Sequence, residues 1–245
     1  MDKLVYLAMS GAKALTQRQD AVANNLANAN TAGFRADLMA FRAVPIRSAD
    51  AASTRVYALE ATAGFDPSAG PVMQTGRPLD VAVRGEGWLA VQGLDGNEAY
   101  TRAGSLDVGA DGTLQTRNGL TVLSDGGPIP VPAGAEISVG DDGTLTAKSP
   151  GQPPVQVARL KLVNPPAAEL RKGADGLLRT ADGQPADADA AVRLAGGALE
   201  SSNVNVVEAM VGMIALSRQF ELQMKMMQTA DQNAQRAQAL LSLKN

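Results

Sequence analysis

The sequence contains neither cysteine nor histidine, and its aromatic residues are limited to one tryptophan, three tyrosines and four phenylalanines. Without cysteine the chain has no disulfide, no cysteine zinc site and no thiol nucleophile. Without histidine it has no Ser-His-Asp triad and no imidazole base. We therefore expect a protein that is not an enzyme, with no catalytic residues, no cofactor and no metal.

Neither strong positive charge nor a long apolar run is present. The 22 basic and 25 acidic residues give a net charge of −3, which argues against a nucleic-acid partner. No uninterrupted apolar run approaches the roughly 20 residues of a membrane-spanning helix, so direct membrane insertion is not expected. The first residues lack the apolar core of a secretory signal, so we expect a cytoplasmic chain or one exported without a cleaved signal peptide.

Glycine and proline are unevenly distributed. Residues 76–200 hold 20 of the 25 glycines and 10 of the 13 prolines, whereas residues 201–245 hold one glycine and no proline. The middle of the chain is therefore predicted to be rich in turns, and the end is predicted to be an uninterrupted helix.

Both ends carry helical apolar patterns. At the N-terminus a helix over about residues 3–30 is predicted, with Gly33 as its C-terminal stop, from the stripe Leu4, Ala8, Gly11, Leu15, Val22, Leu26 and Ala29. At the C-terminus a helix over residues 203–243 is predicted, capped by Asn203 or Asn205. Its heptad positions are Val206, Met213, Phe220, Met227, Ala234 and Leu241, with Ala209, Leu216, Gln223, Ala230 and Ala237 three residues after the first five.

The middle of the chain has strand and turn signals. Leu79, Val81 and Val83 alternate with other residue types, and a second such run over residues 155–162 contains an expected bulge. Six Asp-Gly dipeptides predict turns at residues 95–96, 111–112, 125–126, 142–143, 175–176 and 182–183. This spacing is typical of an all-β sandwich or barrel-like domain.

The predicted fold class is therefore α+β, with long N- and C-terminal helices forming a coiled-coil-like layer and a central all-β domain. The expected parts are an N-terminal assembly helix at 1–33, an extended connector at 34–75, a central β domain at 76–200 and a C-terminal assembly helix at 201–245. Because an apolar stripe in water does not stabilise an isolated helix, each helix must pack against the other, the β domain or other subunits.

Two motifs imitate ligand sites without the required context. Residues 85–90 match G-x-G-x-x-A, but a strand rather than a helix is expected to follow, so a tight turn is favoured over a dinucleotide site. The run from Asp107 to Asn118 lacks two calcium ligands, so a hairpin turn is favoured there. The five methionines between residues 210 and 227 are interpreted as an adaptable helix seam.

Asparagines gather near the end of the N-terminal helix at Asn24, Asn25, Asn28 and Asn30. Asparagine is a mediocre helix former, so one interpretation is a fraying, capped last turn. The other is a set of hydrogen bonds between helices that fixes their register in an assembly.

Four segments resemble bacterial flagellar axial proteins. Ser10-Gly11-Ala12 with ANNLANANTAGFR at residues 23–35 is similar to the N-terminal signature of that family, and LESSNVNVVEAM at 199–210 is similar to its C-terminal signature. TGRPLDVAV at 75–83 and YTRAG at 100–104 resemble the central domain shared by hook and rod proteins. The resemblance covers nearly the whole chain.

The resemblance implies a structural axial subunit of the flagellar basal body. Within the family, residues 1–6 and the length favour a proximal rod subunit, with a distal rod or hook-type subunit as the alternative. The implied partners are other rod subunits, copies of the chain and the flagellar type III export apparatus, and the implied location is the rod where it crosses the periplasm. A secreted hydrolase or an adhesin or fibre module remains a lower alternative.

The expected function is torque transmission by a rod that polymerises through these helices. The residues expected to form the assembly interface lie on both terminal helices: Leu4, Leu15, Val22, Asn24, Asn25, Leu26 and Asn28, with Val206, Met213, Phe220 and Met227. The first set is expected to face the second, with the asparagines making polar contacts near the end of the N-terminal helix.

Overall fold

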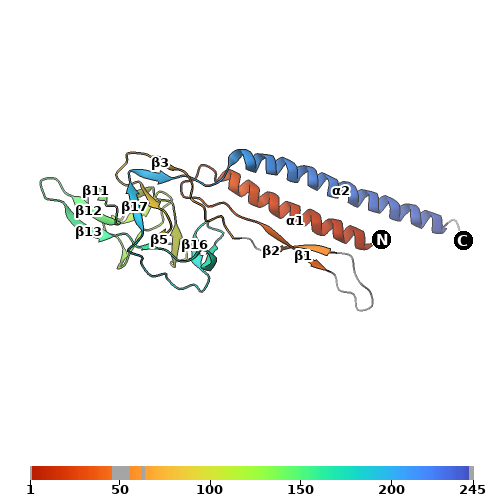
Figure 1. Ribbon diagram of the computed structural model, residues 1–245, viewed down its shortest axis with the longest axis horizontal. Coiled ribbons are helices and arrows are strands. Elements are labelled where there is room, and N and C mark those ends of the chain that lie inside the picture. Colours follow the sequence, from red (N-terminus) through yellow and green to blue (C-terminus); the bar gives the residue numbers. More distant parts are fainter. Residues whose placement is uncertain (1, 46–55, 62–63, 243–245) are drawn as a thin grey trace. The chain divides into compact units, whose positions relative to one another are not determined.

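The computed structural model describes residues 2–45, 56–61 and 64–242 and has one long helix near each end of the chain (Figure 1). Nearly all other regular structure consists of short antiparallel strands. The predicted α+β class and the two terminal helices are therefore confirmed. The coiled-coil character of the helices and the sandwich or barrel-like form of the β domain stay predictions.

The chain forms two compact units, each built from separate segments. We call Met1–Ala27, Asp37–Gly64 and Asn205–Asn245 the helical unit, and Asn28–Ala36 with Phe65–Val204 the β unit. The chain passes from one unit to the other four times. Each unit therefore depends on residues that are far apart in sequence.

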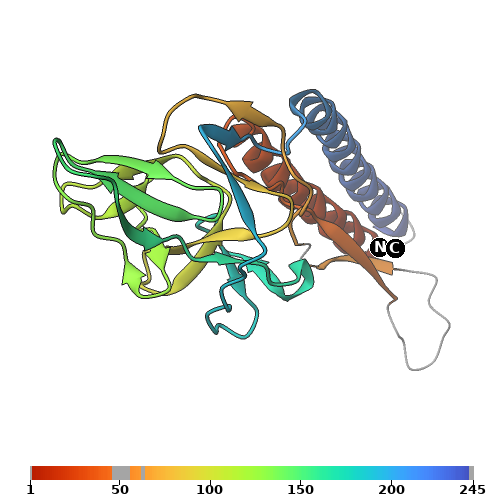
Figure 2. The same ribbon diagram turned by 60° about the vertical axis from the view of Figure 1, so that its left-hand side comes forward.

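The helical unit contains α1 (Asp2–Ala27), β1 (Ala40–Pro45), β2 (Val56–Ala61) and α2 (Val206–Ser242). The two helices run antiparallel and pack side by side, and β2 packs against α1 (Figure 2). Strands β1 and β2 pair from Ala40↔Ala61 to Pro45↔Val56. This hairpin lies within residues 34–75, where we expected an extended connector. Part of that connector therefore pairs with itself.

The ends of both helices differ slightly from the predicted ends. Helix α1 ends at Ala27, so Gly33 is not its stop signal. Helix α2 begins at Val206 because Asn205 caps it: its Oδ1 accepts hydrogen bonds from the N–H groups of Val207 at 3.1 Å and Glu208 at 3.3 Å. Of the two predicted caps, Asn205 is the one used.

The β unit consists of short strands in several antiparallel sheets. The largest sheet has the order β14-β5-β6-β16-β15, a second has the order β11-β12-β13, and the others are pairs. The strands, with one 3-10 turn, are β3 (Val72–Gln74), β4 (Val81–Arg84), β5 (Trp88–Gln92), β6 (Glu98–Thr101), β7 (Leu106–Val108), β8 (Leu114–Thr116), β9 (Leu123–Ser124), β10 (Gly127–Pro128), β11 (Glu136–Val139), β12 (Thr144–Lys148), β13 (Val155–Arg159), β14 (Leu162–Val163), η1 (Ala167–Glu169), β15 (Leu170–Lys172), β16 (Leu178–Thr180), β17 (Arg193–Gly196) and β18 (Ala198–Glu200).

Two apolar clusters form the core of the β unit. The larger includes Leu106, Leu114 and Leu194, and the smaller surrounds Trp88 and Tyr100. Strand β4 departs from the alternation expected of it, because Val81, Ala82 and Val83 are all buried. A strand covered on both faces loses the period-two signal. The bulge expected in the run at residues 155–162 is confirmed, because the pairing of β12 with β13 passes from Leu145↔Ala158 directly to Thr146↔Gln156 and skips Val157 of β13.

A Gly-x-Asp-Gly turn recurs four times, at residues 93–96, 109–112, 140–143 and 173–176. In each turn, the N–H of the first glycine donates a hydrogen bond at 2.8 Å to the carbonyl of the residue that follows the second glycine. The N–H of the second glycine donates a hydrogen bond at 3.0 Å to the carbonyl of the first glycine. Gly143 has φ of +83°, where glycine is favoured over any residue with a side chain. All six predicted Asp-Gly dipeptides place their aspartate in a turn.

The aspartates of these turns are held in their charged form. The side-chain hydroxyl of Thr113 donates to Asp111 and that of Thr144 donates to Asp142, and these bonds, with the backbone N–H groups of the same threonines, lower the pKa of both carboxyl groups. A lowered pKa means that the bonds stabilise the folded state above the ordinary aspartate value of 3.8 and that this contribution is lost as the pH falls.

We expect the double variant Asp111→Asn/Asp142→Asn to be less sensitive to acid than the parent protein, because two carboxyl groups with lowered pKa no longer titrate. Urea unfolding at about pH 6 and about pH 3, followed by the fluorescence of Trp88, measures this. The variant should have a lower free energy of unfolding than the parent protein at about pH 6, and this gap between the two proteins should narrow at about pH 3. Asp187→Asn, an exposed carboxylate outside these turns, is the control, and an unchanged gap would contradict the prediction.

Candidate assembly interface

The heptad positions of α2 form a seam along one side of the helix. Leu216 is 5% exposed, whereas Val211 and Ile214 on other faces are 62% and 57% exposed. The positions that are buried or half-buried at alternating steps of three and four are Ala209, Met213, Leu216, Phe220, Gln223, Met227 and Ala230. This spacing presents a continuous seam to a partner helix.

The polar residue of the seam faces the smallest residue of α1. A Cβ atom placed on Gly11 would lie 3.5 Å from the side chain of Gln223, which is ordinary van der Waals contact. Gln223 therefore lies directly against the backbone of α1. This contact places Gly11 level with Gln223 in the antiparallel pair of helices.

The structure places the other predicted interface residues in different surroundings. Leu15, Val22 and Leu26 of α1 are half-buried, and the side chain of Leu4 lies outside the described part of the chain. Val206, at the first turn of α2, is 36% exposed and lies at the end of the seam. Whether these residues form contacts between subunits stays a prediction.

The asparagines hold the start of the segment that leads to β1. Asn25 donates from Nδ2 to the carbonyl of Asp37 at 3.0 Å and accepts from its N–H at 2.7 Å, and Asn24 donates to the Asp37 carboxylate at 3.0 Å. Asn28 accepts from Thr31 within a local turn. These are contacts within the subunit, in addition to any role between helices.

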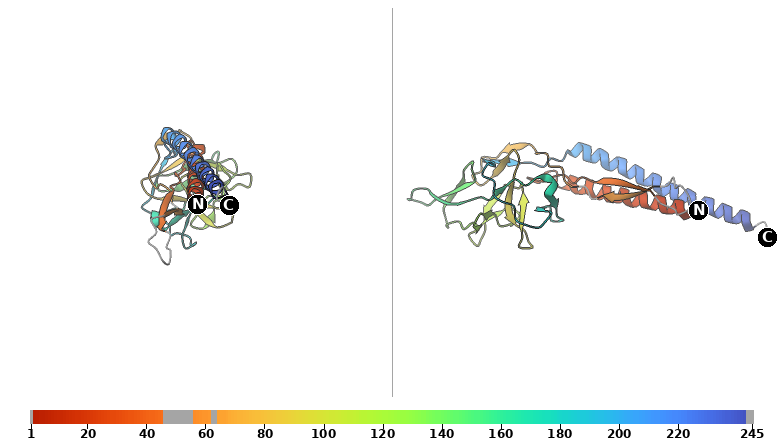
Figure 3. Two further views of the ribbon diagram at one scale, coloured as in Figure 1. Left: turned by 90° about the vertical axis from the view of Figure 1, so that its right-hand side faces the viewer. Right: turned by 60° about the horizontal axis from the view of Figure 1, so that its bottom comes forward.

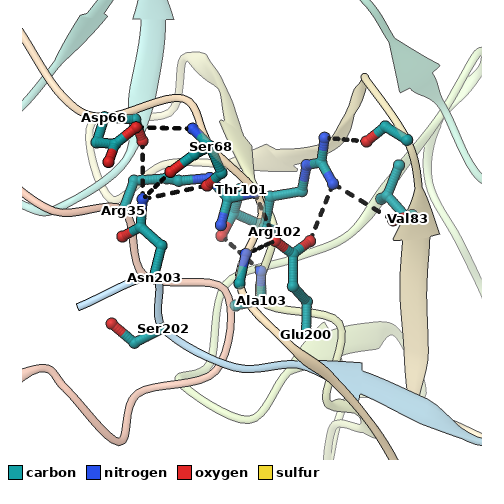
Figure 4. A network of polar contacts seen from close by, with 12 residues as sticks. Arg35, Asp66, Ser68, Val83, Thr101, Arg102, Ala103, Glu200, Ser202 and Asn203 are labelled. Atoms are coloured by element: carbon teal, nitrogen blue, oxygen red, sulfur yellow. Dashed lines mark hydrogen bonds and ion pairs between the residues drawn. The ribbon is translucent and has the colours of Figure 1, made fainter. Parts of the chain in front are cut away.

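A buried ion triad lies in the β unit, and Figure 4 shows its side chains converging. The Glu200 carboxylate contacts Nη2 of Arg35 at 2.6 Å and Nη1 of Arg102 at 2.9 Å, and all three side chains are at most 4% exposed. The N–H of Gly70 donates to the same carboxylate at 2.9 Å, and Arg102 also donates to the carbonyls of Val83 and Gly85. Segments up to 165 residues apart are thus joined at one carboxylate.

Aromatic rings complete the surroundings of the two guanidinium groups. The central carbons of these groups lie 5.5 Å from the Trp88 ring centre for Arg35 and 5.0 Å for Arg102. Phe65 packs edge-on against the same indole at 5.8 Å. Because two positive charges face one carboxylate, the electron-rich face of Trp88 supplies further stabilisation.

The electrostatics of the triad follow from its burial. Removal from water lowers the pKa of Arg102, the attraction of Glu200 opposes this effect, and Arg35 adds to it by repulsion. Removing one member of a buried ion group leaves an uncompensated charge and costs about 3–5 kcal/mol. Removal of the Glu200 carboxylate should therefore lower the stability of the fold more than removal of either arginine, because two cations depend on it.

Asn203 joins two further segments beside the triad (Figure 4). Its Oδ1 accepts from the N–H of Ala36 at 2.8 Å, and its Nδ2 donates to the carbonyls of Asp66 and Ser68, both at 3.1 Å. The N–H of Asp66 in turn donates to the carbonyl of Ala36 at 2.8 Å. Asn203, predicted as a possible helix cap, instead fixes the chain where it leaves and re-enters the β unit.

Gly33 allows the N-terminal segment to approach this network. Its N–H donates to the carbonyl of Glu200 at 2.8 Å, and its φ is +71°. A Cβ atom there would lie 2.1 Å from the carbonyl carbon of Arg102, which is a clash with backbone. Glycine is required at this position for a contact within the β unit rather than as a helix stop.

Two negative observations concern ligands and membranes. The described part of the chain contains no group of three or more acidic, histidine or cysteine residues placed to hold a metal ion. Over the same residues, neither helix combines the length and apolarity needed to cross a membrane.

Sequence reasoning missed the triad, although a signal was present. Arg35, Arg102 and Glu200 each lie in a segment that carries the family resemblance, but none was selected as a site residue. An isolated charged residue in sequence is most often a solvent-exposed one. The missing information was that the three segments meet in space.

We expect Glu200→Gln to lower the free energy of unfolding by about 3 kcal/mol or more, because it leaves two buried guanidinium groups without their carboxylate while keeping the side-chain volume. Urea unfolding measured by Trp88 fluorescence reports on the triad, since Trp88 is the single tryptophan and contacts both arginines. Glu136→Gln, on an exposed position of β11, should change stability by less than about 0.5 kcal/mol. Equal effects of the two substitutions would show that the triad does not stabilise the fold.

Comparison with known proteins identifies three matching segments. Residues 6–35 match the family described as flagella basal body rod protein, residues 82–147 match the flagellar hook protein FlgE/F/G D1 domain, and residues 195–240 match the flagellar basal body rod FlgEFG protein C-terminal family. Each segment contributes one member of the triad: Arg35, Arg102 and Glu200 respectively.

Full-length relatives agree with these matches. The chain is 47% identical to the flagellar basal-body rod protein FlgF of Salmonella typhimurium and 46% identical to that of Escherichia coli, over 99% of this chain and 100% of each relative. It is 30% identical to the flagellar basal-body rod protein FlgG of Bacillus subtilis, over 95% of this chain and 96% of that protein. The chain therefore belongs to the flagellar basal-body rod protein FlgF family.

Proposed function

We propose that the chain is a structural axial subunit of the proximal rod and polymerises through α1 and α2 into a shaft that transmits torque. The observation that carries this proposal is the apolar surface that the helical unit leaves in water. Tyr6 and Met9 of α1 are 59% and 56% exposed, and Val207 and Leu222 of α2 are 71% and 62% exposed. Burial of such side chains contributes about 1.5–3 kcal/mol each, so assembly is favoured.

The family supports a structural role. Its members named above are basal-body rod proteins, so the chain is a structural protein of the basal body and not an enzyme, and the hydrolase and adhesin alternatives are dropped. The higher identity to FlgF than to FlgG supports the proximal over the distal rod. Other rod subunits are its partners, and copies of the chain are proposed as further ones.

The route to the rod is also proposed. A rod subunit that functions across the periplasm must leave the cytoplasm. We therefore assign its export to the flagellar type III apparatus. Absence of cysteine suits such a chain, because it enters an oxidising space without forming stray disulfides.

The terminal helices are proposed to act as a coiled-coil-like layer that is completed only by neighbouring subunits, with the β unit contacting adjacent subunits. Repetition of the same helix contacts along a shaft resists bending and twisting because packed interfaces deform little. The proposed interface residues remain those predicted from the sequence: Leu4, Leu15, Val22, Asn24, Asn25, Leu26 and Asn28 of α1, with Val206, Met213, Phe220 and Met227 of α2.

We expect Phe220→Asp to abolish motility, because a charge at a half-buried seam position prevents close packing of α1 and α2. Swimming in soft agar and the amount of the subunit in isolated basal bodies measure the effect. Gln219→Asp introduces the same charge at the neighbouring exposed position of α2 and should leave motility near the parent level.

The fluorescence of Trp88 in purified Phe220→Asp protein shows whether the β unit remains folded. Normal swimming by the Phe220→Asp strain would rule out a role of the α2 seam in assembly.

A further inference from the structure

The first turns of α2 are apolar on two opposite faces. Val207, Val211 and Ile214 are 71%, 62% and 57% exposed, and each lies two residues from a seam position. Two residues correspond to about 200° around a helix, so these side chains point away from the face that meets α1. We call Val207, Met210, Val211 and Ile214 the outer patch. A helix that is apolar on both faces is typical of one covered on both sides.

A second apolar surface lies further along the same helix. Leu222 and Met226 are 62% and 51% exposed, and they border a shallow groove of about 520 Å³. We call this surface the distal groove; its lining residues are Leu222, Lys225, Met226, Thr229, Ala230 and Asn233. Figure 3 shows that this end of α2 extends past the first residues of α1.

The two surfaces match in spacing. Val207 and Val211 of the outer patch are four residues apart, and so are Leu222 and Met226 of the distal groove. Leu222 lies fifteen residues after Val207, and Met226 lies fifteen residues after Val211. An offset of fifteen residues, about 22 Å along the axis, therefore brings the first pair level with the second. Fifteen residues also turn a helix by about 60° beyond whole turns, so a rotation of the second copy by about 120° about its axis makes the two surfaces face each other. This offset and rotation keep the two helices parallel.

The same shift brings opposite charges together. Glu208 flanks the outer patch and Lys225 flanks the distal groove, and after the shift they lie about two residues, roughly 3 Å, apart along the axis. Both are exposed, and neither forms an ion pair among the residues that the structure describes. Charge complementarity thus supports the register that the apolar pairs select.

We propose that the outer patch of one subunit packs against the distal groove of a second copy, with the α2 helices parallel and offset by about 22 Å, and with Glu208 of one copy beside Lys225 of the other. This contact uses different surfaces on the two copies, so it is heterologous and continues from copy to copy. It rests on the proposed function, because it names the partner and the register of the helix interface.

The test uses the absence of cysteine from the natural chain. In cells that carry Val211→Cys/Met226→Cys as the sole copy, mild oxidation of isolated basal bodies should yield a series of disulfide-linked products that begins at twice the 25.2 kDa subunit mass and continues at higher multiples, because the contact repeats from copy to copy. The two single-cysteine variants are the matched controls and should not yield these products, because the offset keeps identical residues of two copies apart.

A charge exchange tests the same contact without cysteine. In a second set of variants, Glu208→Lys should lower incorporation into basal bodies about fivefold, since it places two cations together. The exchange Glu208→Lys/Lys225→Glu should restore incorporation, whereas Asp20→Lys, the same charge change on an exposed position of α1, should have little effect.

The outcomes separate this inference from the proposed function. Normal incorporation of the double-cysteine variant without a disulfide-linked product, or failure of the charge exchange to restore Glu208→Lys, overturns the proposed contact alone. Absence of the parent protein from basal bodies overturns the rod function itself. If the double-cysteine variant is not incorporated, the charge-exchange result decides.

Discussion

A single buried carboxylate holds together segments from both ends and the middle of the β unit. Glu200 pairs with both Arg35 and Arg102 and accepts a hydrogen bond from the N–H of Gly70, so the arrangement of four chain segments depends on it. Charges removed from water are tolerated when they are paired, so the loss of any one member leaves the others without compensation. Trp88 and Asn203 extend the same junction through stacking and backbone hydrogen bonds.

The two units rely on different physics. The β unit is stabilised by contacts within itself: fully buried leucines, turns whose backbone groups form hydrogen bonds, and the buried ion triad. The helical unit buries one seam and leaves large apolar side chains in water along α2. A unit with its own core and a helical unit with exposed apolar side chains together suit the polymer subunit proposed above, because exposed apolar patches are typical of surfaces that bind other proteins.

Local signals predicted local structure well. The α2 heptad positions from Ala209 to Ala230, the cap at Asn205 and the Asp-Gly turns each depend on residues close in sequence, and the structure has them where expected. The side chains of the later heptad positions Ala234, Ala237 and Leu241 lie outside the part of the chain that the structure describes. Features that depend on distant partners were missed. Strand β4 is covered on both faces, so the alternation expected from its sequence is absent. The β1–β2 hairpin carries no turn signal among its described residues. The triad joins residues up to 165 positions apart.

The interleaving of the two units has a consequence for the order in which the chain can fold. Arg35 belongs to the first segment of the β unit, and its counter-charge belongs to the last, so a chain that lacks its final 46 residues has two cations and no carboxylate at the junction. Contacts of such long sequence separation form late, because loop closure must precede them. The β unit therefore carries a built-in check on its own synthesis: only a chain that has been made past Glu200 can close it.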